Sequence, residues 1–189
     1  MVGLARGTVS LAPHDPAWAE RYAAEVDRLR AVVGDDISEF HHVGSTAVPG
    51  VPAKPIVDVL AVVPSRETAR ALVPTLEANG YEHRPNDGVP DRVFLAKGPR
   101  SNRTHYLSLT ERGSDTCAEQ IAFRDYLRAN PPVAAAYAGL KRDLAARFPD
   151  DRAAYTERKG EFVERVLDRA GDGPPYSSTE THSPVSADR

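Results

Sequence analysis

The stretch "HHVGSTAVPGVPAKPIVDVL", residues 41–60, decides the fold of this chain. A strand-like run ends at Gly-Ser-Thr, residues 44–46, and a proline-containing loop with Lys54 leads into a second, nearly all-apolar strand. β-branched residues dominate that second segment, which is typical of a buried strand. It carries one carboxylate, Asp58. The pattern is typical of a phosphate loop beside a metal-binding acid, and also of a tight turn before an ordinary strand.

Working outward from this stretch, the hydrophobic spacing predicts strands and helices in a mixed order. The expected strands cover 8–12, 37–43, 55–63, 91–97 and 103–110. The expected helices cover 16–33, 66–79, 114–129, 131–148 and 151–170. This order predicts an α+β (α/β) domain that has a small mixed β-sheet flanked by helices, with a helical cluster at the C-terminal end.

Composition limits the classes of function. A chain of 189 residues, 41% hydrophobic and 27% charged, is typical of one globular domain, which we place at residues 1–170. Residues 171–189 are rich in proline, serine and threonine, which indicates a disordered tail. The net charge of −3 argues against a non-specific nucleic-acid binder. We expect neither a sequence-specific nucleic-acid partner nor a membrane partner. We find neither a signal peptide nor a membrane span, so a cytoplasmic location is expected; the oligomeric state stays open.

The loop itself suggests anion binding. Between two strands, Gly44, Ser45 and Thr46 can direct backbone N–H groups and two hydroxyls into one concavity, as phosphate sites do. Lys54 adds a cation to the ligand-binding set. Asp58 on the next strand can hold Mg²⁺ against phosphate oxygens, which makes it the candidate metal ligand and a candidate catalytic residue.

Histidines and arginines supply further candidates. His42, two residues before the glycine, is a candidate acid–base group. Arg103 and His105 lie two residues apart on one expected strand, so we expect them to share a face; Arg103 would bind an anion and His105 would handle a proton. Arg124 is a ligand-binding candidate on a helix, although an Arg–Asp neighbour pair there is usually a packing feature.

Three residues of the C-terminal helices complete the candidate ligand-binding set. Lys159 interrupts an apolar helical stripe that includes Tyr155, and Lys141 flanks a similar stripe. A lysine at such a place extends from the rim of the core to water, or reaches over the sheet to an anion bound at the loop. The Tyr155 hydroxyl can join it.

Residues 41–63, together with "RTHYLSL" and "FRDYLRANP", carry a resemblance to a known family. They are similar to the GrpB family of the nucleotidyltransferase superfamily, and the likeness covers about residues 8–170. The resemblance implies a nucleotidyltransferase-like fold, a small anionic or phosphorylated substrate and Mg²⁺. A domain of this kind also occurs fused behind dephospho-CoA kinase in some actinobacteria, which suggests nucleotide or CoA-related ligands.

The chain departs from the superfamily's catalytic pattern at two positions. That pattern has two acids two residues apart on a strand and a third on a later strand. Leu60 stands at the position of the second acid, and the later strand offers His105, Tyr106 and Ser108 rather than a third acid. Ser108 stands where relatives in the family tend to have a histidine. Nucleotidyl transfer with two metals needs several carboxylates. Whether the protein is an enzyme therefore stays open, with a transferase as the enzyme class that the resemblance implies.

Three hypotheses follow from the sequence. The first is a nucleotidyltransferase-like enzyme that binds a nucleotide or another phosphorylated ligand with Mg²⁺. The second is a binding or regulatory module that kept the pocket and lost the chemistry. The third is a metal-poor enzyme, such as an acyl or amide transferase, in which Ser45, Arg103 and His105 carry the reaction.

Overall fold

A five-stranded mixed sheet forms the middle layer of the molecule in the computed structural model, which describes residues 2–5, 9–85 and 87–171. The strands lie in the order β1-β2-β5-β4-β3, and only β2 and β5 are parallel to each other. Their bounds are β1 Glu39–Val43, β2 Val57–Val63, β3 Tyr81–His83, β4 Arg92–Lys97 and β5 His105–Glu111. This confirms the predicted mixed sheet.

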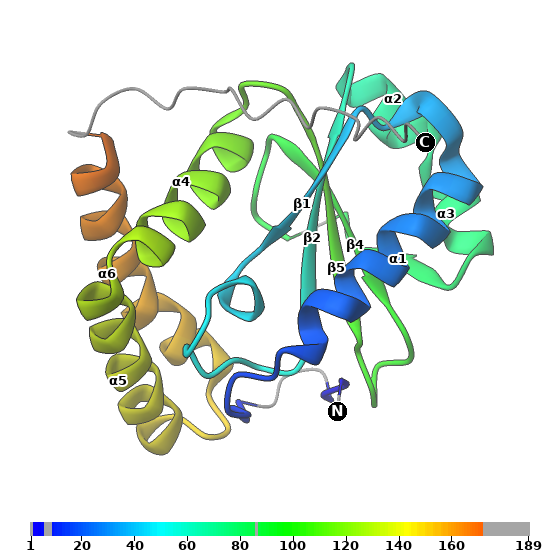
Figure 1. The fold of residues 1–189 in the computed structure, drawn as a ribbon. Coiled ribbons are helices and arrows are strands. Elements are labelled where there is room, and N and C mark those ends of the chain that lie inside the picture. Colours follow the sequence, from blue (N-terminus) through cyan, green and yellow to red (C-terminus); the bar gives the residue numbers. More distant parts are fainter. Residues whose placement is uncertain (1, 6–8, 86, 172–189) are drawn as a thin grey trace, which may run out of the picture.

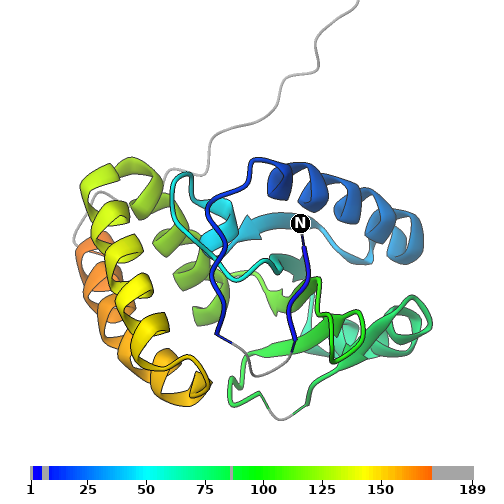
Figure 2. The ribbon, with the colours of Figure 1, turned by 90° about the horizontal axis from the view of Figure 1, so that it is seen from below.

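Helices cover both faces of the sheet (Figure 1). On one face lie α1 (Ala17–Val33), α2 (Arg66–Ala71) and α3 (Val73–Ala78). On the other lie α4 (Asp115–Ala129), α5 (Pro131–Arg147) and α6 (Arg152–Gly171), the predicted C-terminal helical cluster. Two short 3₁₀ helices, η1 (Gly34–Asp36) and η2 (Ser45–Ala47), flank β1. Figure 2 shows α5 and α6 side by side at one edge of the molecule.

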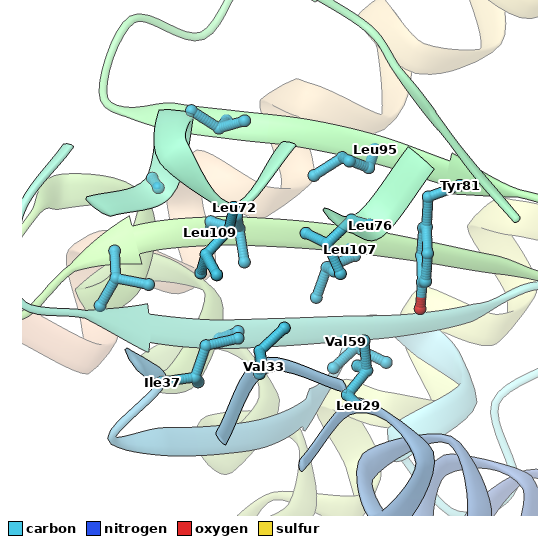
Figure 3. Packing of buried hydrophobic residues seen from close by; sticks show 14 of the residues in the cluster. Leu29, Val33, Ile37, Val59, Leu72, Leu76, Tyr81, Leu95, Leu107 and Leu109 are labelled. Atoms are coloured by element: carbon cyan, nitrogen blue, oxygen red, sulfur yellow. The ribbon is translucent and has the colours of Figure 1, made fainter. Parts of the chain in front are cut away.

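The main core lies between the sheet and α1, α2 and α3. Because side chains alternate along a strand, the register directs Val57, Val59 and Ala61 of β2 to the same face as Leu107 and Leu109 of β5. Figure 3 shows side chains of this layer, with Leu29 and Val33 of α1, Leu76 of α3 and Leu72 between α2 and α3 packed onto the strands. One face of the sheet is therefore filled, and Asp58 of β2 and Tyr106 and Ser108 of β5 fall on the other.

The structure corrects the helix predicted over 66–79. It is divided into α2 and α3 at Leu72, two residues before Pro74. Proline has no amide hydrogen, and its ring conflicts with the carbonyl of the residue four positions earlier. A single helix through Pro74 would therefore lose a hydrogen bond and gain a clash.

Two strand predictions also change. Among the described residues of 8–12, Ala12 forms an isolated bridge with Ala53 rather than a strand, and residue 8 lies outside the described residues. The short β3 is not among the predicted strands. The tail predicted over 171–189 lies outside the described residues except for Gly171, the last residue of α6. None of the described helices combines the length and apolar composition needed to cross a bilayer.

A charged cluster is buried beside the main core. Glu25 of α1 is 4% exposed and accepts hydrogen bonds from the Tyr81 hydroxyl at 2.7 Å, from Arg28 Nη2 at 2.6 Å and from Lys97 Nζ. Burial raises the pKa of Glu25, but the three donors outweigh it and hold the pKa at about 2. The cluster fastens α1 to β3 and β4.

The Glu25 cluster should contribute stability that depends on pH. A lowered pKa in the folded state stabilises the protein above the unfolded value of about 4.5, and that stability is lost as the pH falls toward about 2. We expect Glu25→Gln to lower the free energy of unfolding by about 2 kcal/mol near neutral pH. The difference from wild type should shrink below pH 4.5, as measured by urea denaturation. Glu20→Gln, on the exposed side of α1, is the control and should change little.

Candidate functional site

A cavity of about 850 Å³ lies between the second face of the sheet and the layer of α4, α5 and α6. The loop after β1 contributes Gly44, Ser45 and Thr46 to its wall, and the strands contribute Asp58 of β2 and Tyr106 of β5. Asp58 and Tyr106 are register partners, so their side chains lie next to each other on this face. The helices close the opposite side.

Gly44 allows the loop to lie directly on β2. Its φ of 70° belongs to the left-handed region, which favours glycine. A Cβ at this position would be 3.1 Å from Cγ of Asp58 and closer still to one carboxylate oxygen. The turn and the acid are therefore packed against each other, and Ser45 begins η2 immediately afterwards.

The loop is held from its far side by α4 and α1. Arg124 Nη1 donates to the His42 carbonyl at 3.1 Å, and Arg128 Nε donates to the Ala47 carbonyl at 2.9 Å. The His42 ring hydrogen-bonds Thr46 through Nε2 at 3.0 Å and stacks on Tyr22 of α1, with ring centroids 4.7 Å apart. These contacts fix the path of the loop between two helices.

His42 and Arg124 were predicted to act on a ligand, but neither residue lines the cavity. Their side chains are buried behind the loop. Burial, together with the charges of Arg128 and Arg124, lowers the pKa of His42 to about 4, so its ring is neutral near neutral pH. Both residues position the loop, and the structure gives neither a direct path to a ligand.

Three lysines from three segments converge on the cavity wall. Lys54 precedes β2, Lys141 lies on α5 and Lys159 on α6. Lys141 Nζ donates to the Pro52 carbonyl, and Lys54 Nζ lies over the Tyr155 ring, 4.8 Å from its centroid. None of the three forms an ion pair within the described part of the chain.

The lysines and Asp58 shift one another's pKa values. Burial raises the pKa of Asp58 to about 6, although Lys159, Arg92, Lys141 and Lys54 all favour its charged form. Burial lowers the pKa of Lys141 to about 7 and that of Lys54 to about 8, with repulsion from Lys159 adding to both shifts. The pKa of Lys159 is lowered in the same way. Near neutral pH the negative charge of Asp58 is therefore smaller than the positive charge of the lysines around it.

The prediction that Arg103 and His105 share a face is wrong. His105 pairs with Val57, so it lies on the filled face, where its Nδ1 bonds the Thr104 hydroxyl at 3.0 Å. Arg103 precedes β5 and reaches the edge of the cavity, where its guanidinium donates to the Gly98 carbonyl and to Glu82. Arg103 forms an isolated bridge with Leu4 and lies outside β5, so the side-chain alternation of the strand does not extend to it.

The separation of Arg103 from His105 rules out the site of the third hypothesis, an acyl or amide transferase that uses both residues together with Ser45. Ser45 faces the cavity, Arg103 is paired with Glu82 and His105 is on the other side of the sheet. An acyl or amide transfer that used these three side chains together has no common site.

The structure brings most of the other predicted residues together and adds several that the sequence analysis missed. Gly44, Ser45, Thr46, Lys54, Asp58, Lys141, Tyr155 and Lys159 all line the cavity. The missed wall residues include Phe94, Tyr106, Phe123, Tyr137 and Arg152. Arg152 lies three residues before Tyr155 and seven before Lys159, so helical periodicity could have identified it. Tyr106 could not be found, because the register of β2 and β5 is a tertiary feature.

The residues of this cavity do not fit a two-metal site. Mg²⁺ requires several oxygen ligands, usually including carboxylates. Asp58 is the one acidic residue that the loop and β2 contribute to the cavity wall. The next register pair on the same face of the sheet, Leu60 and Ser108, adds no carboxylate. In the described ranges, no group of three or more His, Cys, Asp or Glu side chains could hold a metal ion. The charged groups that act on the pKa of Asp58 are all cations.

Comparison of the sequence with known proteins identifies the family of this chain. Residues 8–169 match the family described as "GrpB protein", and the chain belongs to this family. It is 37% identical to the UPF0157 protein YqkA of Bacillus subtilis over 86% of this chain and 47% of that protein. It is 34% identical to the glutamate-rich protein GrpB of Alkalihalophilus pseudofirmus, over 88% and 98% of the two chains.

Some relatives are much longer than the matching region. The chain spans about half the length of YqkA, and likewise 47% of a dephospho-CoA kinase of Mycolicibacterium paratuberculosis, to which it is 31% identical over 89% of its own length. The activities of those longer proteins are therefore not carried over to this chain.

Solved structures confirm the nucleotidyltransferase-like fold. A crystal structure of GrpB from Enterococcus faecalis superposes with a TM-score of 0.79 at 33% identity, covering 85% of this chain and 96% of that one. The Cid1 poly(U) polymerase with MgGTP bound superposes with a TM-score of 0.51 at 15% identity, over 71% of this chain and 44% of Cid1. At that identity the likeness shows the fold alone.

Gly44→Ala tests the contact between the loop and Asp58. We expect a loss of about 3 kcal/mol in the free energy of unfolding, since the new Cβ adds a clash to the strain of a positive φ. Gly50→Ala is the control. Its φ is 76°, but a Cβ there meets no atom within 4 Å, so the expected loss is only about 1 kcal/mol. Equal losses measured by urea denaturation would contradict the close packing on Asp58.

Proposed function

We propose that this chain binds a phosphorylated small molecule, with a nucleotide as the first candidate, in the cavity between the sheet and α4–α6. The observation that carries the proposal is the convergence of Ser45 and three lysines around Asp58 in one cavity. A cluster of cations without ion-pair partners is costly to bury unless an anion offsets it.

The size and lining of the cavity support a ligand larger than inorganic phosphate. About 850 Å³ is within the range of cofactor and substrate pockets. Aromatic rings line the wall next to the charged end, with Phe94 and Tyr106 in contact at 5.2 Å between centroids. Such rings can stack on a nucleobase. The relative that is a dephospho-CoA kinase and the neighbour described with MgGTP bound are consistent with this ligand class.

The chemistry of the cavity favours binding over two-metal nucleotidyl transfer. That reaction places carboxylates around two metal ions, whereas this chain has Leu60 where the superfamily pattern places the second acid, and His105, Tyr106 and Ser108 of β5 supply no third one. We therefore propose a ligand-binding or regulatory role that keeps the pocket of the ancestral fold. Ser45 would donate its hydroxyl to a phosphate oxygen, and the lysines would offset the charge.

Ligand-induced stabilisation tests this proposal. We expect at least one of AMP, ADP, ATP and CoA to raise the melting temperature, and calorimetry should then give a dissociation constant. Lys159→Met should weaken that affinity about tenfold or more, because it removes a desolvated charge that faces the anion. Ser45→Ala should weaken it less.

The matched control is Arg142→Met, which removes one positive charge from the exposed side of α5 next to Lys141. It should leave the affinity within about twofold, as expected for a screened surface charge. If none of the phosphorylated compounds shifts the melting temperature, the proposed function is wrong. Equal effects of Lys159→Met and Arg142→Met would show that the cavity is not the site.

A further inference from the structure

We infer that the ammonium groups of Lys54, Lys141 and Lys159 take the place of metal ions in this cavity, so that it binds a free polyphosphate anion rather than the magnesium complex. This inference rests on the proposed function and deepens it, because it names the ionic form of the ligand and the groups that neutralise it.

The distribution of lysine is the first observation. The chain contains four lysines and twenty arginines. Three of the four lysines line this one cavity, and the fourth, Lys97, pairs with Glu25 on the other face of the sheet. A chain that otherwise uses arginine for its positive charges has lysine at these three positions.

Lysine and arginine differ in how their positive charge is distributed, and this difference matters for phosphate binding. Arginine carries its charge on a broad planar fork, whereas the ammonium group of lysine is a compact point charge with three donors. A compact charge can approach several phosphate oxygens at once. A divalent metal ion bound to a polyphosphate bridges oxygens in the same way.

Neutral partners fix the positions of two of the three side chains, Lys141 and Lys54. The Pro52 carbonyl holds Lys141, whose Nζ also lies 5.3 Å from the centroid of the Tyr137 ring. Lys54 lies over the face of Tyr155. Carbonyl and aromatic partners orient a cation without cancelling its charge, so the ammonium groups stay available to an anion.

A metal ion would be repelled from the same place. Asp58 is surrounded by Lys159, Arg92, Lys141 and Lys54. The other acids of the wall are engaged or distant from the loop: Asp87 pairs with Arg92 at 2.6 Å, and Glu119 is exposed on α4. Three cations around one carboxylate leave an excess positive charge that a ligand with at least two negative charges would offset. A monophosphate carries about −1.5 to −2, but only a di- or triphosphate has enough separate phosphate groups to contact all three ammonium groups, and this is the ligand class that we assign.

The sign of the magnesium effect tests the inference. ATP affinity is measured by calorimetry on the full chain, once with excess EDTA and once with excess MgCl₂. Because Mg²⁺ neutralises two charges of ATP, we expect it to weaken binding by about threefold or more. AMP, which chelates Mg²⁺ poorly, is the control for an effect through the protein itself and should be unaffected. Tighter binding of ATP with Mg²⁺ would overturn the inference while leaving the proposed function in place.

Two substitutions separate an ammonium site from a metal site. Lys159→Arg keeps the charge but not the compact shape, so we expect it to weaken ATP binding in EDTA about tenfold. Lys97→Arg is its matched control and should leave the affinity unchanged. Asp58→Asn should preserve or strengthen ATP binding in EDTA, since it removes a competing negative charge; a metal ligand would instead lose binding.

The failures are distinguishable. Loss of ATP affinity in Asp58→Asn, or full affinity in Lys159→Arg, would overturn the role of the ammonium groups even if ATP binds the wild-type chain. Absence of binding by every phosphorylated probe in both EDTA and MgCl₂ would contradict the proposed function itself. The melting temperature of each variant without ligand shows whether it is folded.

Discussion

The turn after β1 can lie on β2 only because residue 44 has no side chain. Asp58 occupies the space that a Cβ would need, and the positive φ of Gly44 sends the chain back over the strand. From this contact follow the direction of η2, the exposure of Ser45 to the cavity and the position of Lys54 at the far end of the loop. The two arginines of α4 then hold the loop carbonyls, so the helical layer is tied to the sheet through the same segment.

Most of the fold could be predicted from local patterns. The four longer strands and the helices that became α1, α4, α5 and α6 have clear periodicity, and their bounds in the structure differ by one or two residues at most ends. The single helix over 66–79 was wrong because Pro74 interrupts an otherwise continuous pattern. The three-residue β3 was missed because a strand so short has too few residues to show an alternation.

The site was predictable where it depends on the loop and on helical periodicity, and not where it depends on register. Gly44, Asp58 and Lys159 could be selected because each interrupts a local pattern. Which face of β5 lines the cavity depends on how this strand pairs with β2. That parallel pairing joins two strands that the whole β3–β4 segment separates in the sequence. The assignment of His105 to the cavity failed for that reason, and the geometry instead supports Tyr106.

The cavity also has a consequence for motion. Of the three helices on this face, α4 lies directly against the sheet, whereas α5 and α6 pack mainly on α4 and on each other. A large part of the space beneath them is the cavity rather than apolar core. α5 and α6 share an apolar cluster with α4 and the loop, but they make few contacts with the sheet, and a unit with few contacts to the sheet opens at lower free energy than the sheet itself. The amide hydrogens of α5 and α6 should therefore exchange with solvent earlier than those of β2 and β5, and an occupant of the cavity would slow that exchange by joining the two layers.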